Sequence, residues 1–254
     1  MSNKFDLTGK VAIVTGSSKG IGAHIATAFA ENGAHVIVSS RKQEAVDKVA
    51  EEIKSKGGSA EAIACHVGEK EQLENLVQKT KEKFGGIDIL VNNAAINPVF
   101  EKLLNSDDTV FDKIMNVNLK ACLNLSNMCH PSMVERGGGS IINIASVEGL
   151  KPTFGLGLYS ISKAALIMLT KSQAKEWGRK NIRSNAICPG LIKTKFSKAL
   201  WENESQLESF TKHLPMPRMA QPEEMRGLAV YLASDNSSYT TGGVYTSDGG
   251  YMLV

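Results

Sequence analysis

A tyrosine and a lysine four positions apart, Tyr159 and Lys163, are the pair in this chain best suited to proton transfer. On a helix, residues at this spacing project from the same face, so the phenol and the ammonium would lie close together. A phenol with a pKa of about 10 is a poor acid or base at neutral pH, and a nearby positive charge lowers that pKa. Ser146 would add a hydroxyl to hold the oxygen whose proton moves. The same spacing also occurs in ordinary helices, so the surrounding elements must decide between the two interpretations.

A glycine-rich stretch, residues 15–22, lies between an apolar run and the first helical pattern. Its glycines are spaced GxxxGxG, which differs from the GxGxxG dinucleotide fingerprint but permits the same physics. Glycines let the backbone approach a pyrophosphate, and the helix N-terminus offers free amides and a positive dipole. The alternative is a tight turn without a ligand. The position of the glycine-rich stretch in the first βα unit favours a dinucleotide. The expected contacts in this turn are Gly16, Ser18, Lys19, Gly20, Ile21 and Gly22.

The residues after the second predicted strand distinguish the two nicotinamide dinucleotides. A carboxylate there would bind the ribose hydroxyls of NAD, but this chain has Ser40 and Arg41 and no acid. An arginine offers bidentate hydrogen bonds to a 2′-phosphate, and Lys19 adds a second cation on the same side. Solvated surface charge is the alternative for each residue taken singly. Together they predict NADPH/NADP+ as the cofactor.

Apolar, β-branched runs alternate with longer helical patterns along the chain, which indicates a parallel sheet covered on both faces. We therefore expect an α/β fold with a Rossmann-type doubly wound sheet of about seven strands. The predicted strands are 10–15, 35–39, 60–65, 87–91, 139–145, 182–188 and about 244–245. Helices are expected to end near 32 and to span about 43–56, 69–84, 106–130, 158–178 and 222–234. With no linker or repeat, residues 1–254 are predicted to form a single dinucleotide-binding and catalytic domain.

The composition limits the classes of partner. Hydrophobic residues make up 42% and charged residues 22%, and the net charge of +3 is too mild to argue for nucleic acid. No run is long and apolar enough to cross a bilayer, and the N-terminus lacks a signal-peptide core, so a cytoplasmic location without membrane contact is expected. The cysteines lack CxxC spacing and the histidines lack a metal motif, so no metal site is predicted. We expect Cys65, Cys122, Cys129 and Cys188 to be reduced.

The motifs, in this order and spacing, resemble the short-chain dehydrogenase/reductase family in its compact single-domain branch. The similarity covers essentially the whole chain. Within the family, the chain is most similar to NADPH-dependent carbonyl reductases of the retinal-reductase type. The stretches that carry it are 15–22, Asn92-Asn93-Ala94-Ala95, Asn118, Ser146, Tyr159-xxx-Lys163, 189–194 and Ser247-Asp248-Gly249-Gly250.

The resemblance implies a role for each matching residue. Tyr159 would be the general acid in carbonyl reduction, Lys163 would lower its pKa and bind the nicotinamide ribose, and Ser146 would orient the carbonyl. Asn118 would hold a water that relays protons from Lys163. His66 stands where many members have an aspartate that contacts adenine. The residues expected along the cofactor are Ser40, Arg41, His66, Val67, Asn93, Ala94, Ala95, Tyr159, Lys163, Pro189, Gly190, Ile192 and Thr194.

Three functions stay open at this point. The first is reduction of a ketone or aldehyde to an alcohol, with the reverse reaction. The second is reduction of a 3-oxoacyl thioester, for which Lys193, Lys195 and Lys198 would meet the carrier. The third is a non-catalytic NADPH-binding protein, against which the complete Ser, Tyr, Lys and Asn set argues.

A segment of about 191–219 follows the Pro189-Gly190 turn and is predicted to be a substrate lid. Its apolar side chains favour a hydrophobic substrate; Val147, Leu156 and Tyr251 are further pocket candidates. Relatives assemble through the two long central helices and the last helix and strand, which implies a homotetramer. The apolar lid residues are Phe196, Leu200, Trp201, Leu207, Phe210 and Leu214.

Overall fold

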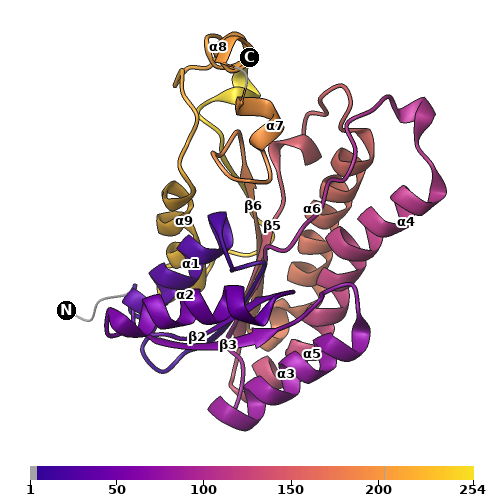
Figure 1. Cartoon of the computed structure of the whole chain (residues 1–254). Coiled ribbons are helices and arrows are strands. Elements are labelled where there is room, and N and C mark those ends of the chain that lie inside the picture. The colour runs from indigo at the N-terminus through magenta and orange to yellow at the C-terminus, as the bar shows by residue number, and fades with distance from the viewer. Residues whose placement is uncertain (1–4, 203) are drawn as a thin grey trace.

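The computed structural model of the protein describes residues 5–202 and 204–254, in which seven parallel strands form one sheet (Figure 1). The strand order is β3-β2-β1-β4-β5-β6-β7, and every neighbouring pair is parallel. This confirms the predicted Rossmann-type sheet. The strands are β1 (Val11–Thr15), β2 (His35–Ser40), β3 (Ser59–Ala64), β4 (Ile89–Asn92), β5 (Gly139–Ile144), β6 (Ile182–Pro189) and β7 (Val244–Ser247).

Helices cover both faces of the sheet. In Figure 1, α1 (Gly20–Glu31), α2 (Gln43–Ser55) and α9 (Arg226–Ala233) lie on one side. The other side carries α3 (Lys70–Phe84), α4 (Asp108–Met115), α5 (Ala121–Glu135) and α6 (Gly157–Trp177). A 3₁₀ turn, Pro222–Met225, leads into α9, so the helix predicted at 222–234 divides into two parts.

The apolar runs form a two-faced core because successive strand side chains point to opposite faces. In β1, Ala12 and Val14 pack with the helices α1, α2 and α9, whereas Ile13 packs with α3 and α5. In β2, Val36 and Val38 join the first core. Both faces are buried, which explains why the strands lack polar alternation.

The order of the strands reverses between β1 and β4, which are adjacent although β2 and β3 lie between them in sequence. In open α/β sheets, ligands bind beyond the carboxyl ends of the strands at such a switch point. The glycine-rich turn follows β1, and the Asn93–Ala95 stretch follows β4. The fold therefore brings both predicted stretches to the same edge of the sheet.

The helix expected at 106–130 differs from the prediction in two ways. It comprises α4, a π-helical turn at Asn116–Lys120, and α5, which continues to Glu135 through Pro131. A proline removes one helical hydrogen bond, but the buried Cys129 and Met133 pack this part of α5 onto the core and hold it helical.

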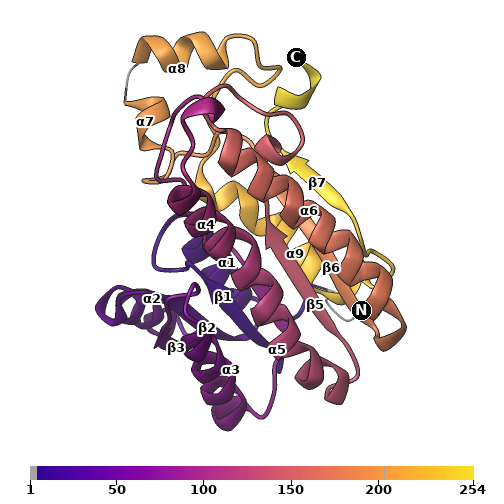
Figure 2. The ribbon, with the colours of Figure 1, turned by 90° about the vertical axis from the view of Figure 1, so that its right-hand side faces the viewer.

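The segment after β6 carries two short helices, α7 (Lys198–Trp201) and α8 (Glu204–Thr211). Figures 1 and 2 both show them at one end of the molecule, close to the end of the chain that follows β7. The side chain of Leu200, one of the predicted lid residues, and residue 203 lie outside the described part of the structure.

Within residues 5–202 and 204–254, the helices are all too short or too polar to span a lipid bilayer.

Candidate active site

The glycine-rich turn has a conformation that requires glycine. Gly16 and Gly20 have φ angles of +65° and +57°, in the left-handed region that other residues rarely adopt. A Cβ atom on Gly22 would lie 2.5 Å from Nδ2 of Asn93 and 2.7 Å from the carbonyl oxygen of Gly16. The Asn93 side chain donates hydrogen bonds to the carbonyls of Thr15 (2.9 Å) and Gly16 (3.2 Å). Asn93 thus holds the turn from the neighbouring strand end.

Two hydroxyl groups that no sequence motif singled out, those of Thr15 and Ser17, also hold this turn in place. The Thr15 hydroxyl accepts hydrogen bonds from the backbone amides of Asn93 (3.0 Å) and Ala94 (3.1 Å). The buried Ser17 hydroxyl accepts one from the amide of Ser39 (2.9 Å) and so joins the turn to the end of β2. The turns after β1, β2 and β4 are therefore fixed to one another. The signal in the sequence was the placement of hydroxyl residues where the first strand ends.

The predicted cations stand beside this turn. Lys19 directly precedes α1, Arg41 directly follows β2, and both are exposed. Among the described residues, neither takes part in an ion pair. No side chain caps α1 at Lys19, so the backbone amides at the N-terminus of this helix have no side-chain partner there. Ser40, at the end of β2, is half-buried. The arrangement can accept a doubly charged phosphate.

The stretch expected near adenine follows β3. The amide of Gly68 donates to Nδ1 of His66 (3.2 Å), and the amide of His66 donates to Oε1 of Gln72 (2.7 Å). Val67 is half-buried and packs against the core beneath α3 and α5. These contacts fix the loop, with His66 turned onto its own backbone.

On the other side of the switch point, the loop after β6 faces the glycine-rich turn. A Cβ on Gly20 would lie 3.3 Å from Cγ2 of Thr194. Gly190 is pressed against the loop after β7, since its Cβ would lie 2.7 Å from Cα of Asp248. Ile192 is buried and pairs with Ala220. The structure therefore brings the predicted 189–194 stretch up to the α1 N-terminus.

The four predicted catalytic side chains are all buried: Asn118, Ser146, Tyr159 and Lys163. Burial raises the pKa of the Tyr159 phenol; a hydrogen bond with Ser146 lowers it, while the negative charge of Glu148 raises it further. Ser146 has an extended backbone and directly precedes the 3₁₀ turn Val147–Gly149. Its hydroxyl accepts a hydrogen bond from the amide of Glu148 (3.1 Å). The phenol and the hydroxyl thus face each other in a largely dry environment.

Lys163 lies beside the tyrosine, as expected from a spacing of four on α6. Its Nζ is 5.6 Å from the centroid of the Tyr159 ring and donates to the carbonyl of Ile144 at 2.7 Å. Burial lowers the pKa of the ammonium to about 8, so most of it is protonated at neutral pH. The Tyr159–Lys163 spacing predicts a lowered phenol pKa, but in this structure the phenol pKa is raised, because the burial of Tyr159 outweighs the other influences.

Asn118 lies in the π-helical turn, which the sequence pattern did not predict. Its side chain accepts a hydrogen bond from the amide of Ile96 (2.8 Å) and donates one to the carbonyl of Ile96 (2.9 Å). It also donates to the hydroxyl of Ser162 (3.1 Å), the residue before Lys163. Such π-turns occur often at functional sites. Asn118 thus ties the loop after β4 to the helix that carries the tyrosine and the lysine.

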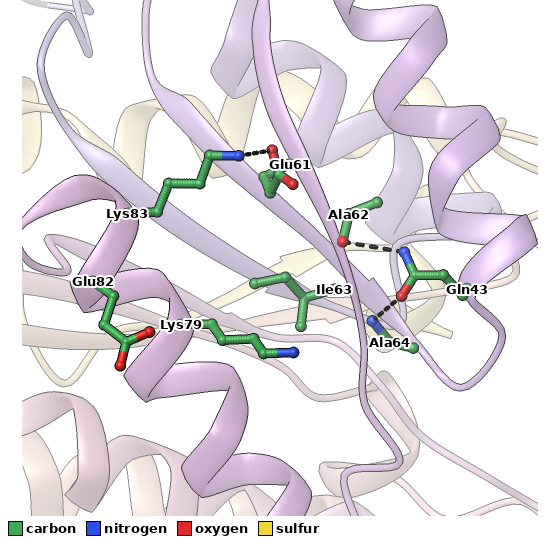
Figure 3. A pocket seen from close by; sticks show the side chains of 8 residues that line it. All are labelled: Gln43, Glu61, Ala62, Ile63, Ala64, Lys79, Glu82 and Lys83. Atoms are coloured by element: carbon green, nitrogen blue, oxygen red, sulfur yellow. Dashed lines mark hydrogen bonds and ion pairs between the residues drawn. The ribbon is translucent and has the colours of Figure 1, made fainter.

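A hollow elsewhere on the molecule lies along the edge strand β3 and does not contain any residue of the predicted site (Figure 3). There, the side chain of Gln43 donates to the carbonyl of Ala62 (3.1 Å) and accepts the amide of Ala64 (3.0 Å). Lys83 forms an ion pair with Glu61. These contacts cover backbone groups and place charge on the edge, which discourages pairing with another strand. We read this hollow as a protected sheet edge.

The fold and the clustered Ser, Tyr, Lys and Asn side chains define a dinucleotide-dependent oxidoreductase. The family model for enoyl-(acyl carrier protein) reductase matches residues 16–252. The chain belongs to the short-chain dehydrogenase/reductase family.

Relatives and solved structures match over nearly the whole chain. Dehydrogenase/reductase SDR family member 4 of Oryctolagus cuniculus is 46% identical over 244 residues, which cover 96% of this chain and 94% of that protein. A gluconate 5-dehydrogenase of Burkholderia cenocepacia in complex with NADP and tartrate has a TM-score of 0.95 at 32% identity, covering 99% of this chain and 98% of that one. A 7α-hydroxysteroid dehydrogenase complexed with NADH and 7-oxo glycochenodeoxycholic acid has a TM-score of 0.94 at 34% identity, with 98% of each chain covered.

The cofactor is accordingly a nicotinamide dinucleotide, NAD(P)H. The residues of this chain fit such a group. The turn at Gly16 and Gly22 leaves no room for side chains, and the uncapped α1 N-terminus offers amides and a positive dipole to a pyrophosphate. Gly16, Ser18, Lys19, Gly20, Ile21 and Gly22 would hold the phosphates.

Replacing Gly22 with alanine is expected to weaken dinucleotide binding by ~10-fold or more and to lower the melting temperature. The added Cβ would displace the Asn93 amide or the Gly16 carbonyl, both closer than 3 Å. Fluorescence titration with NADPH and thermal melting measure the two effects. Gly178→Ala is the matched control, because no atom lies within 4 Å of its Cβ and its φ is −56°. Unchanged affinity in Gly22→Ala would show that the turn does not contact the dinucleotide.

Proposed function

We propose that this chain is an NADPH-dependent reductase of ketones or aldehydes, which also oxidises the corresponding alcohols. The observation that carries the proposal is the burial of Ser146, Tyr159 and Lys163 together at the carboxyl edge of the sheet. A dinucleotide turn reaches the same edge. The preference for NADPH rests on the exposed Arg41 and Lys19, which form no ion pair with any described residue, and on the absence of an acid at residues 40–42.

In reduction, Tyr159 donates its phenolic proton to the carbonyl oxygen. The raised pKa keeps the phenol protonated at neutral pH, which is the form that a general acid needs. The hydroxyl of Ser146 hydrogen-bonds the same oxygen and stabilises the negative charge that develops on it. The bound dinucleotide supplies the hydride. In oxidation, Tyr159 must act as a phenolate, so alcohol oxidation is favoured at higher pH than reduction.

Lys163 contributes a positive charge and a hydrogen-bond donor beside the phenol. Its bond to the Ile144 carbonyl fixes the ammonium beneath the ring, where it would bind the nicotinamide ribose. Asn118 orders this region through Ile96 and Ser162, and we propose that it holds a water that returns protons to Lys163. The remaining contacts to the dinucleotide would come from Ser40, His66, Val67, Asn93, Ala94, Ala95, Pro189, Gly190, Ile192 and Thr194.

The substrate side is apolar, which supports a hydrophobic carbonyl compound. We propose that residues 191–219 form a lid whose Phe196 ring stands 5.8 Å from the ring of Tyr159. Phe210 stacks on Tyr251 at 5.4 Å. Both phenylalanines are exposed, and so is Phe154 in the loop before α6. Exposed aromatic side chains around a buried acid–base pair are typical of a binding site for an apolar ligand.

Reduction of a 3-oxoacyl thioester is the second candidate, since it uses the same four catalytic residues. The lysines that would meet a carrier are partly engaged within the lid. Lys198 pairs with Glu202 at 2.8 Å, and Lys193 lies 5.5 Å from the Trp201 ring centroid. Only Lys195 of the three lacks such a contact among the described residues. This observation favours the free carbonyl compound.

The proposal is tested by the loss of NADPH absorbance with a panel of carbonyl compounds. We expect turnover with lipophilic ketones or aldehydes to exceed turnover with acetoacetyl and 2-enoyl thioesters. Faster turnover of a 3-oxoacyl thioester would favour the second candidate. Absence of turnover with every compound, despite NADPH binding, would contradict an enzymatic role and favour the non-catalytic alternative.

The proposal extends to assembly as a homotetramer. Apolar side chains are exposed on the outer faces of α4, α5 and α6, where the family resemblance places subunit contacts. Phe111 and Leu123 are 39% exposed, Ile161 is 43% exposed and Met168 is 60% exposed. Such exposure on packed neighbouring helices is typical of a subunit interface.

Sedimentation equilibrium at micromolar concentration is expected to give a mass of four times 27.3 kDa. Met168→Glu should shift this mass toward the dimer or monomer, because it places four charges in apolar interfaces, while the exposed position leaves the fold of each subunit intact. A wild-type monomer under these conditions would contradict the proposed assembly.

We also propose a cytoplasmic location. All four cysteines are buried and free, as expected for a protein in a reducing compartment.

A further inference from the structure

The turn after Ser146 contains a carboxylate that the proposed reaction does not use. Glu148 accepts hydrogen bonds from the amide and the hydroxyl of Thr153, at 2.8 and 2.6 Å, and from the hydroxyl of Ser160 at 3.1 Å. Its own amide donates to the Ser146 hydroxyl at 3.1 Å. Ser160 directly follows Tyr159 on α6. Glu148 thus contacts Ser146 through its backbone amide and Ser160, the neighbour of Tyr159, through its side chain.

The same network reaches the lid. The hydroxyl of Thr153 lies 3.3 Å from the phenolic oxygen of Tyr251. The Tyr251 ring stacks on Phe210 of α8 at 5.4 Å, and Lys151 lies 5.2 Å from the centroid of the same ring. A continuous series of contacts therefore runs from α8 through Tyr251 and Thr153 to Glu148.

The carboxylate of Glu148 is held by neutral donors and has no ion-pair partner in the described part of the chain. A half-buried charge that lacks a cation is costly unless hydrogen bonds satisfy it. The donors of Thr153 and Ser160 satisfy the carboxylate here, so a negative charge can lie in this turn without a cation.

We propose that Glu148 is a positioning residue, which holds Ser146 and Tyr159 in place relative to each other and to the lid and brings a negative charge to the helix turn that carries Tyr159. This inference rests on the proposed function. The charge favours the protonated phenol, the form that donates a proton in reduction. The hydrogen bonds keep the loop 147–156 against α6.

The titratable groups that lie near the Tyr159 ring or influence its phenol come from three elements. Lys163 lies on α6, Cys188 on β6 and Glu148 on the turn after β5. Burial raises the pKa of the Cys188 thiol to about 11, so this group is neutral at pH 7. The negative charge of Asp248 also raises the pKa of Cys188. Glu148 is therefore the anionic group that acts directly on the phenol at neutral pH.

Glu148→Gln and Glu148→Asp separate the charge from the hydrogen bonds. The glutamine variant keeps the size of the side chain but loses the charge. We expect its pH profile for alcohol oxidation to shift toward lower pH by ~0.5 unit or more, since the negative charge that raises the phenol pKa is removed. The aspartate variant keeps the charge but is too short for its three partners. We expect an unshifted profile and a kcat lowered by ~3- to 10-fold.

Two further variants complete the design. Thr153→Val removes both the bridge to Tyr251 and one hydrogen bond to Glu148 without changing the charge, and it should raise KM and lower kcat for the best ketone with no shift of the profile. Glu52→Gln removes an exposed carboxylate on α2 and should change neither parameter. Thermal melting of each variant establishes that it is folded.

The outcomes distinguish this inference from the proposed function. If the wild-type protein oxidises and reduces its best substrate but Glu148→Gln has the wild-type pH profile and kcat, Glu148 is not a positioning residue and the proposed function stands. If the wild-type protein reduces no carbonyl compound, the function and this inference are both overturned. A profile shifted equally in Glu52→Gln would also overturn it.

Discussion

Replacing Tyr159 with phenylalanine is expected to lower kcat for carbonyl reduction by ~10³-fold or more. The substitution removes the phenolic oxygen and leaves a ring of nearly the same shape in the same buried position. The reacting oxygen then loses its proton donor, and the Ser146 hydroxyl loses its partner. Affinity for NADPH should remain within a factor of about two, because the turn at 15–22 and Arg41 are untouched.

Steady-state kinetics and fluorescence titration measure the two quantities. Tyr239→Phe is the matched control, because Tyr239 is fully exposed and the same oxygen is lost there without consequence. Wild-type turnover in Tyr159→Phe would remove Tyr159 from the mechanism.

The second large effect is expected for Arg41→Asp. The ratio of kcat/KM for NADPH to that for NADH should fall by ~10- to 100-fold, because a charge-assisted hydrogen bond to the 2′-phosphate is replaced by repulsion. The new carboxylate can also accept the ribose hydroxyls of NADH. Arg41 has no ion-pair partner among the described residues, so the change should leave the fold intact.

Parallel assays with both dinucleotides give the ratio directly. Arg179→Asp, an exposed charge reversal in the turn after α6, serves as the control. An unchanged ratio in Arg41→Asp, or equal efficiency with both dinucleotides in the wild-type protein, would contradict the assignment to NADPH.

Much of the fold follows from local signals. The β-branched runs predict buried parallel strands because both faces of the sheet are covered, and the glycine-rich turn marks where β1 meets α1. The long central helix was harder to predict. Its π-turn at Asn116–Lys120 depends on contacts of Asn118 with Ile96 and Ser162, which are distant in sequence. Its extension through Pro131 depends on tertiary packing.

The residues of the candidate site also fall into those that local patterns predict and those that depend on tertiary contacts. Residues with a spacing signal, such as the glycines and the Tyr159–Lys163 pair, could be placed from the sequence. Thr15, Ser17 and Glu148 could not, because what singles them out is hydrogen bonds to other segments of the chain. The direction in which the phenol pKa shifts also depends on burial, which the spacing of residues in the sequence does not predict. Local pattern points to the candidate site, and tertiary contacts determine its electrostatics.

The most direct test of the central claim follows the hydride. NADPH deuterated at C4 is incubated with the best carbonyl substrate of the panel, and the product is analysed by mass spectrometry and NMR. Transfer of hydride to a carbonyl predicts one deuterium on the carbinol carbon of the alcohol, with strong loss of product in Tyr159→Phe. Deuterium at the β-carbon of a reduced enoyl compound, with none delivered to any carbonyl, would contradict the account.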